Sequence, residues 1–117
     1  MIKKLEIKSD NKLQNLTSYH GISIIDSRQH LSSIFGCPRR IDSGDKKVTY
    51  MWEFVYTNEM GEEVGITLYD WKMSKVVTET ARINWHIGSK GKSKAEEFAK
   101  YIGEKYNLEI SSEDYDL

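Results

Sequence analysis

The strongest constraint on the fold is an alternation of apolar and polar residues that recurs in three consecutive segments. It runs through 48–57, 64–71 and 80–87, and short turns at 58–61 and 72–75 separate the segments. A period of two residues is typical of a β-strand that is buried on one face. Because hairpin turns join antiparallel neighbours, the pattern predicts a three-stranded antiparallel meander.

One helix is predicted before this meander in the sequence, and another is predicted after it. The later one has an apolar stripe at spacings of three and four residues, which is typical of a helix packed on a core. Ser93 and Glu96 have the spacing of a capping box at its start, and Asn107 is expected to end it. A shorter helix is predicted over 27–35, with Asp26 as its N-terminal cap. The stripe consists of Ala95, Phe98, Ala99, Ile102 and Tyr106.

The expected fold is α+β: a three- to four-stranded antiparallel sheet, with the C-terminal helix packed on one face and a short N-terminal helix. Residues 1–117 are expected to form a single domain, in which 1–18 and 108–117 are peripheral or flexible. The face under the helix is predicted to hold Tyr50, Trp52, Phe54, Val64, Ile66, Leu68, Ile83 and Trp85. The opposite face is predicted to hold Met51, Glu53, Val55, Thr67, Tyr69, Arg82, Asn84 and His86. This second face is either a recognition surface, an ordinary solvated face, or a face covered by the N-terminal helix.

Composition restricts the classes of function. The formal net charge is −1, so bulk charge gives no reason to expect nucleic-acid or membrane binding. Cys37 is the only cysteine, which excludes an intramolecular disulfide and favours a reducing, cytoplasmic setting. It follows a predicted helix end and precedes Pro38, so a buried or half-buried structural role is expected. No apolar run has membrane-spanning length, and no membrane partner is expected.

The segment from Gly88 to Ser93 predicts an anion site. Lys90, Lys92 and Lys94 crowd a helix N-terminus, an end that already carries partial positive charge. Glycine-freed backbone amides at such an end bind anions, although an exposed solubilising loop is the alternative. The segment is not a nucleotide-hydrolysing P-loop, because His86 stands where that motif needs its first glycine. No histidine pair has metal-ligand spacing, so neither a metal nor a cofactor is predicted.

A second cluster is the run Tyr69-Asp70-Trp71-Lys72 at a strand end. Its aromatic rings are suited to stacking on a nucleotide base, with Asp70 or Lys72 pairing to the base edge or a phosphate. In the alternative interpretation, Trp71 packs against the protein and Asp70 caps the turn. His86 could form an acid–base set with Glu53 and Tyr69 if the strands align.

The aromatic motifs together resemble a protein family. These motifs are Phe35-Gly36-x-Pro38, Trp52-x-Phe54, Ile66-x-Leu68-Tyr69-Asp70-Trp71-Lys72 and Trp85-His86-Ile87-Gly88. Over about residues 20 to 105 the chain is similar to a family of small proteins encoded by bacteriophages. The resemblance implies an accessory protein that acts in the cytoplasm of an infected bacterium. It implies no reaction and no catalytic residues.

The leading functional hypothesis is a non-enzymatic phage counter-defence protein. It would sequester a small anionic nucleotide immune signal, of the cyclic-nucleotide or ADP-ribose type, and act as a homo-oligomer. The alternative is an inhibitor that binds a host defence protein or nuclease directly, and a small hydrolase using His86 is a third possibility. The residues expected to bind the ligand are Tyr69, Trp71, Arg82, His86, Ser89, Lys90, Lys92 and Ser93.

Overall fold

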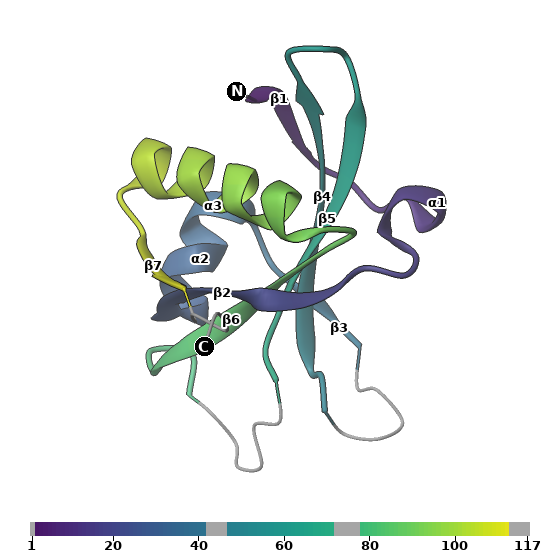
Figure 1. Ribbon diagram of the computed structural model, residues 1–117. Coiled ribbons are helices and arrows are strands. Elements are labelled where there is room, and N and C mark those ends of the chain that lie inside the picture. The colour runs from purple at the N-terminus through teal and green to yellow at the C-terminus, as the bar shows by residue number, and fades with distance from the viewer. Residues whose placement is uncertain (1, 42–46, 72–77, 113–117) are drawn as a thin grey trace, which may run out of the picture.

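The computed structural model describes residues 2–41, 47–71 and 78–112, which form one antiparallel sheet and three helices (Figure 1). Within these residues the sheet has seven strands in the order β1-β4-β5-β6-β2-β7, with β3 also paired to β4. The strands are β1 (Ile2–Ile7), β2 (Ser18–Ser27), β3 (Arg39–Arg40), β4 (Tyr50–Asn58), β5 (Glu63–Tyr69), β6 (Arg82–Ser89) and β7 (Glu109–Ser112). The helices are α1 (Asn11–Gln14), α2 (Arg28–Phe35) and α3 (Lys92–Tyr106). None of these helices is both long and apolar enough to cross a membrane.

The predicted sheet of three to four strands is therefore wrong, because β1, β2 and β3 pair with the meander and β7 pairs with β2. Two of them interrupt the period-two alternation of apolar and polar residues. The register of β1 against β4 shifts between Ile2 and Lys4, and that of β2 against β6 shifts between Tyr19 and Ser23. Gly21 lies in the second irregularity with a φ of 87°. A bulge moves the following side chains to the other face, so period-two patterns do not detect such strands.

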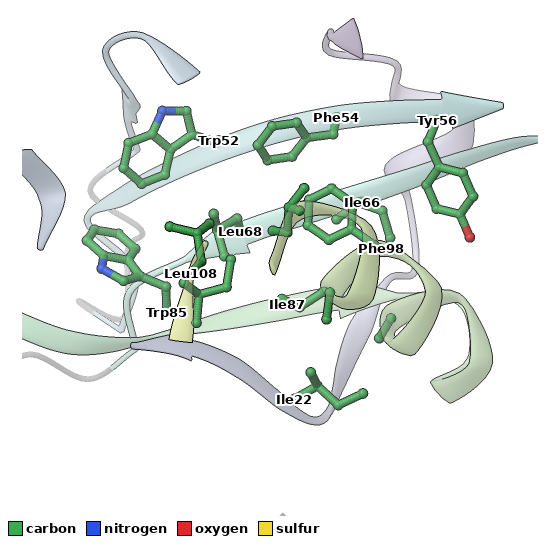
Figure 2. Close-up of a cluster of buried hydrophobic side chains, with 14 of the residues drawn as sticks. Ile22, Trp52, Phe54, Tyr56, Ile66, Leu68, Trp85, Ile87, Phe98 and Leu108 are labelled. Atoms are coloured by element: carbon green, nitrogen blue, oxygen red, sulfur yellow. The ribbon is translucent and has the colours of Figure 1, made fainter. Parts of the chain in front are cut away.

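The predicted meander itself is confirmed as β4, β5 and β6. Trp52 pairs with Leu68, and Leu68 pairs with Ile87, so these three side chains share one face of the sheet. Figure 2 shows this face filled by large side chains, with Phe98 of α3 packed against them. Leu31 and Phe35 place α2 in the same core. The buried core includes Ile22, Ile24, Trp52, Phe54, Tyr56, Val64, Ile66, Leu68, Trp85, Ile87, Phe98 and Ile102.

Two tryptophan side chains connect this core to both ends of α2. The Nε1 atom of Trp52 donates a hydrogen bond to the carbonyl of Gly36, just after α2, at 2.8 Å. The Nε1 atom of Trp85 donates to the carbonyl of Asp26, just before α2, at 3.0 Å. The two indoles also pack edge to face, with ring centroids 5.1 Å apart. Each buried indole N–H thereby has a hydrogen-bond acceptor, and the two bonds fix α2 in position over the sheet.

Three local expectations are corrected by the structure. Ser27 rather than Asp26 caps α2, because its hydroxyl accepts a hydrogen bond from the backbone N–H of His30 at 3.1 Å. The predicted capping box of α3 is absent among the described residues: Gly91 is the N-cap, and no side chain caps that end. Cys37 is exposed rather than buried, since it follows the helix end at Gly36 on the surface.

Helix α1 lies on the opposite side of β4 and β5 from α2 and α3 (Figure 1). Gly65 of β5 makes this approach possible, because a Cβ atom there would lie 2.5 Å from the backbone carbonyl of Leu13. Asp10 caps the helix by accepting from the N–H groups of Lys12 and Leu13. Gln14 is buried and donates from Nε2 to the carbonyls of Lys8 and Phe54, at 2.8 and 3.0 Å. These contacts fix one turn of helix on the face that α3 leaves open.

Replacing Gly65 with alanine tests this arrangement. We expect Gly65→Ala to lower the free energy of unfolding by about 1–3 kcal/mol, because the new methyl group forces α1 away from β5. Urea denaturation measures the loss. Gly91→Ala is the matched control, since a Cβ there meets nothing within 4 Å and the φ of 174° is extended. Gly91→Ala should lower the free energy of unfolding by less than about 1 kcal/mol. Equal losses in the two variants would contradict the packing of α1 on Gly65.

Candidate ligand-binding groove on the open sheet face

The sheet face opposite α3 carries two neighbouring rows of side chains. In the first row, Met51 pairs with Tyr69, and Tyr69 pairs with His86. In the second row, Glu53 pairs with Thr67. Residues paired across a sheet point to the same side, so one row presents rings and the other presents a carboxylate and a hydroxyl.

Aromatic side chains from three segments meet on the first row. His86 stacks on Tyr19 of β2, with centroids 3.7 Å apart and an interplanar angle of 10°. Trp71, just after β5, lies nearly parallel to His86 at 6.0 Å and 22°. Tyr69 meets both His86 and Trp71 edge to face, at 5.7 and 6.2 Å. Tyr19, Tyr69, Trp71 and His86 are called the aromatic cluster below.

Asp70 positions Trp71 at the edge of this cluster. The side chain of Asp70 is buried, and its Oδ1 atom accepts from the backbone N–H groups of Thr49 and Tyr50 at 2.8 and 3.0 Å. It thus bonds the end of β5 to the start of β4. Of the two interpretations of this motif, the structure supports the capping role for Asp70. Lys72, the last residue of the motif, lies outside the described residues.

A groove of about 580 Å³ separates the aromatic cluster from α1. This volume lies within the range of sites that hold small organic ligands. Glu53 and Thr67 line it between the two walls, and Thr17 approaches Thr67 with 3.5 Å between the hydroxyl oxygens. The groove is lined by Asn11, Gln14, Asn15, Thr17, Val48, Met51, Glu53, Thr67, Tyr69 and Trp71.

Several polar groups of the groove are available to a ligand. Asn11 and Asn15 lie one helical turn apart and are exposed, and no described residue bonds to either side-chain amide. Gln14, in contrast, uses its amide within the protein. Burial raises the pKa of the Tyr69 hydroxyl, and the charge of Tyr19 raises it further. The Tyr69 hydroxyl therefore stays protonated at neutral pH and can donate a hydrogen bond.

Three basic side chains contact residues that line the groove or belong to α1, and the lining itself carries one carboxylate, that of Glu53. Arg39 of β3 pairs with Glu53, with Nη2 to Oε1 at 3.0 Å, and offsets its charge. The Nζ atom of Lys47 lies 5.8 Å from the centroid of the Trp71 ring, a cation–π distance. The Nζ atom of Lys90 donates to the carbonyl of Lys12 in α1 at 3.0 Å. An anionic group at the rim of the groove would meet these cations.

The structure brings together only part of the predicted site. Tyr69, Trp71 and His86 lie in the aromatic cluster, and Lys90 reaches α1. Arg82 lies four residues along β6 from His86, about 13 Å away, and pairs with Glu109 at 2.7 Å.

The remaining predicted residues lie at the end of β6 and in the first turn of α3. Ser89 is fully buried, and its hydroxyl donates to the carbonyl of Gly91 at 2.6 Å. Lys92 and Ser93 are exposed in the first turn of the helix. His86 pairs directly with Tyr69, but Glu53 belongs to the neighbouring row and is bonded to Arg39. The described residues contain no group of three His, Cys, Asp or Glu side chains able to hold a metal.

The amides of α1 are the part of the groove that sequence reasoning missed. The segment 10–17 reads as a polar turn, because one turn of helix is too short to show a periodic stripe. The available signal was Asp10, whose carboxylate precedes the helix as a cap.

No family model, no curated protein and no solved structure matches this chain. The groove is therefore interpreted from its own chemistry.

The role of Asp70 is tested by removing its carboxylate. We expect Asp70→Ala to lower the free energy of unfolding by about 1–3 kcal/mol, because two backbone N–H groups lose their acceptor. Chemical denaturation gives the value. Asp70→Asn keeps an oxygen that can accept these bonds, and it should be the milder change. If alanine and asparagine were equally damaging, the side-chain oxygen would not be what holds the strand end.

Proposed function

We propose that the protein is a non-enzymatic nucleotide-binding protein and that the groove between α1 and the aromatic cluster is its binding site. The observation that carries the proposal is the arrangement of three kinds of group around one groove. Tyr69 and Trp71 supply aromatic rings, Asn11 and Asn15 supply unused amides, and cations lie at the rim. A nucleotide has a matching flat base, a hydrogen-bonding edge and a negatively charged phosphate.

The aromatic wall accounts for binding of the base. Every nucleobase has a π-face, and stacking on an aromatic side chain contributes about 1–3 kcal/mol per base. Trp71 is half-buried and lines the groove, so part of this residue is open to a ligand from that side. Asp70 holds its backbone in place, which lowers the entropic cost of presenting the ring to a ligand.

The rim accounts for binding of the phosphate. Lys47 approaches the Trp71 ring, and Lys90 bonds to the backbone of α1, so one cation contacts each of the two elements that flank the groove. Lysine binds phosphate as a point charge and tolerates varied geometry. Pairing with Arg39 reduces the repulsion that the Glu53 carboxylate would otherwise exert on an anion.

We also propose a biological role for this binding, from the aromatic motifs that resemble those of small phage-encoded proteins. We propose that the protein acts in the cytoplasm of an infected bacterium and sequesters a nucleotide immune signal, as a counter-defence protein. Sequestration needs tight binding and no turnover, so stacking rings and hydrogen-bonding groups are sufficient for it. A homo-oligomeric state stays a prediction.

The first test is a thermal-shift screen with mononucleotides, cyclic dinucleotides and trinucleotides, cyclic ADP-ribose isomers, NAD and ATP. A ligand at about 100 times its Kd stabilises the fold by roughly 2.7 kcal/mol, which raises Tm visibly in a domain of this size. Trp71→Ala should then weaken binding of the ligand found by about tenfold or more in calorimetry. Lys90→Ala should weaken it as well.

Two variants on α3 serve as controls. Tyr101→Ala removes an aromatic ring, and Lys100→Ala removes a cation, both outside the groove. Neither should change the Kd. A flat response to the whole panel would overturn the proposed function, as would a ligand whose affinity is unaffected by Trp71→Ala.

A second candidate function is direct binding of a host defence protein. Leu16 favours it, because this apolar side chain is 85 % exposed between two residues of the groove wall. Its φ of 63° is uncommon for a residue other than glycine. A backbone conformation of this kind persists where the surrounding structure enforces it, so we propose the exposed Leu16 side chain as the contact for a protein partner. Co-purification of one host protein that Leu16→Asp abolishes, together with no response to nucleotides, would select this function.

A further inference from the structure

Glu53 is placed at the bottom of the groove as an almost buried carboxylate. Its side chain is 12 % exposed and lines the groove beside Thr67, its partner across the strands. The Oε1 atom accepts from Arg39 at 3.0 Å, and the Oε2 atom accepts from the hydroxyl of Ser9 at 3.3 Å. A carboxylate this enclosed is held in one orientation by its two bonds.

We propose that Glu53 is the specificity residue of the groove and selects ligands that present two adjacent hydrogen-bond donors. This inference rests on the proposed nucleotide-binding function and names the chemistry that the site recognises. An ionised carboxylate only accepts hydrogen bonds, and its two oxygens offer about four lone-pair positions. Arg39 and Ser9 occupy two of these among the described residues, so each oxygen keeps capacity for one further donor.

Burial makes this selection strong. A ligand that covers the groove removes Glu53 from the remaining water, so any oxygen that the ligand does not satisfy costs free energy. A site that bonds a polar group rejects analogues lacking that group by much larger factors than an apolar pocket achieves. The same carboxylate disfavours a ligand that presents acceptors at this position, because two acceptors repel.

A nucleotide offers this donor pair from two sources. The guanine edge presents N1–H beside the exocyclic 2-amino group, and a ribose presents its 2′- and 3′-hydroxyl groups. Adenine presents no such pair. Thr67 and the amides of Asn11 and Asn15 surround the same space and can bond the neighbouring acceptors of either source.

Calorimetry with four ligands separates the sources: the 5′-monophosphates of guanosine, inosine, adenosine and 2′-deoxyguanosine. If Glu53 recognises the guanine edge, guanosine monophosphate should bind at least about tenfold more tightly than the inosine and adenosine monophosphates. 2′-Deoxyguanosine monophosphate should then bind as tightly as guanosine monophosphate. Recognition of the diol predicts similar affinities for the three ribonucleotides and a loss of about tenfold or more for the deoxy form. Either outcome supports the inference and names the source.

Two variants test whether Glu53 causes the selection. Glu53→Gln replaces one acceptor oxygen by a donor, and it should remove the discrimination between ligands. Arg39→Gln breaks the same ion pair but keeps the carboxylate, so it should lower the affinity for all four ligands and keep their order. Circular dichroism and Tm show whether each variant is folded. The four-ligand comparison on the unchanged protein needs no variant.

The outcomes separate this inference from the function on which it rests. Binding of all four ligands with equal affinity would overturn the donor-pair selection and leave nucleotide binding intact. Unchanged discrimination in a folded Glu53→Gln protein would overturn the role of Glu53. Absence of binding to all four, together with a flat response in the wider screen, would overturn both proposals.

Discussion

The packing of Trp52 against Trp85 is the interaction on which the rest of the molecule depends. The two rings lie on adjacent parts of one sheet face, and their indole N–H groups bond to opposite ends of α2. This arrangement fixes which face of β4 and β6 is buried. Since side chains alternate along a strand, a slip of one residue would exchange the two faces completely. The buried tryptophans therefore also determine that Glu53 and His86 point to the open side.

The sequence predicted those elements in which the spacing of apolar residues matches the period of the strand or helix that forms. The strands β4, β5 and β6 pair with one another without a register shift. Helix α3 buries four residues of its predicted stripe, Ala95, Phe98, Ala99 and Ile102, and Tyr106 is half-buried. The other strands could not be assigned to the sheet from the pattern, for physical reasons. β1 and β2 contain register shifts that change the phase of the alternation, and β7 has only four residues. Long-range pairing, not local propensity, places these strands in the sheet.

The candidate site was predictable to the extent that it lies on the regular strands. Tyr69 and His86 were placed on one face by alternation alone, and their pairing follows from the register of β5 and β6. Arg82 fulfils the same alternation but is bonded to Glu109 of β7, a strand that the sequence pattern did not reveal. The wall formed by α1 depends on Gln14, which bonds to a carbonyl forty residues away in β4. Such a contact leaves no periodic trace in the sequence.

The positions of two glycines indicate that the groove is a specific feature of the fold and not simply the solvated face of a sheet. A solvated face has no need of glycine, which weakens a strand by removing a side chain and adding backbone entropy. Yet Gly65 and Gly88 both lie on the open face, opposite Val55 and Thr67 in the strand pairing. At Gly65 the missing side chain admits the backbone of α1, and at Gly88 a Cβ atom would collide with the hydroxyl of Thr67. The stability that these glycines cost is offset where α1 packs and bonds to the sheet, and what remains between α1 and the aromatic cluster is the groove.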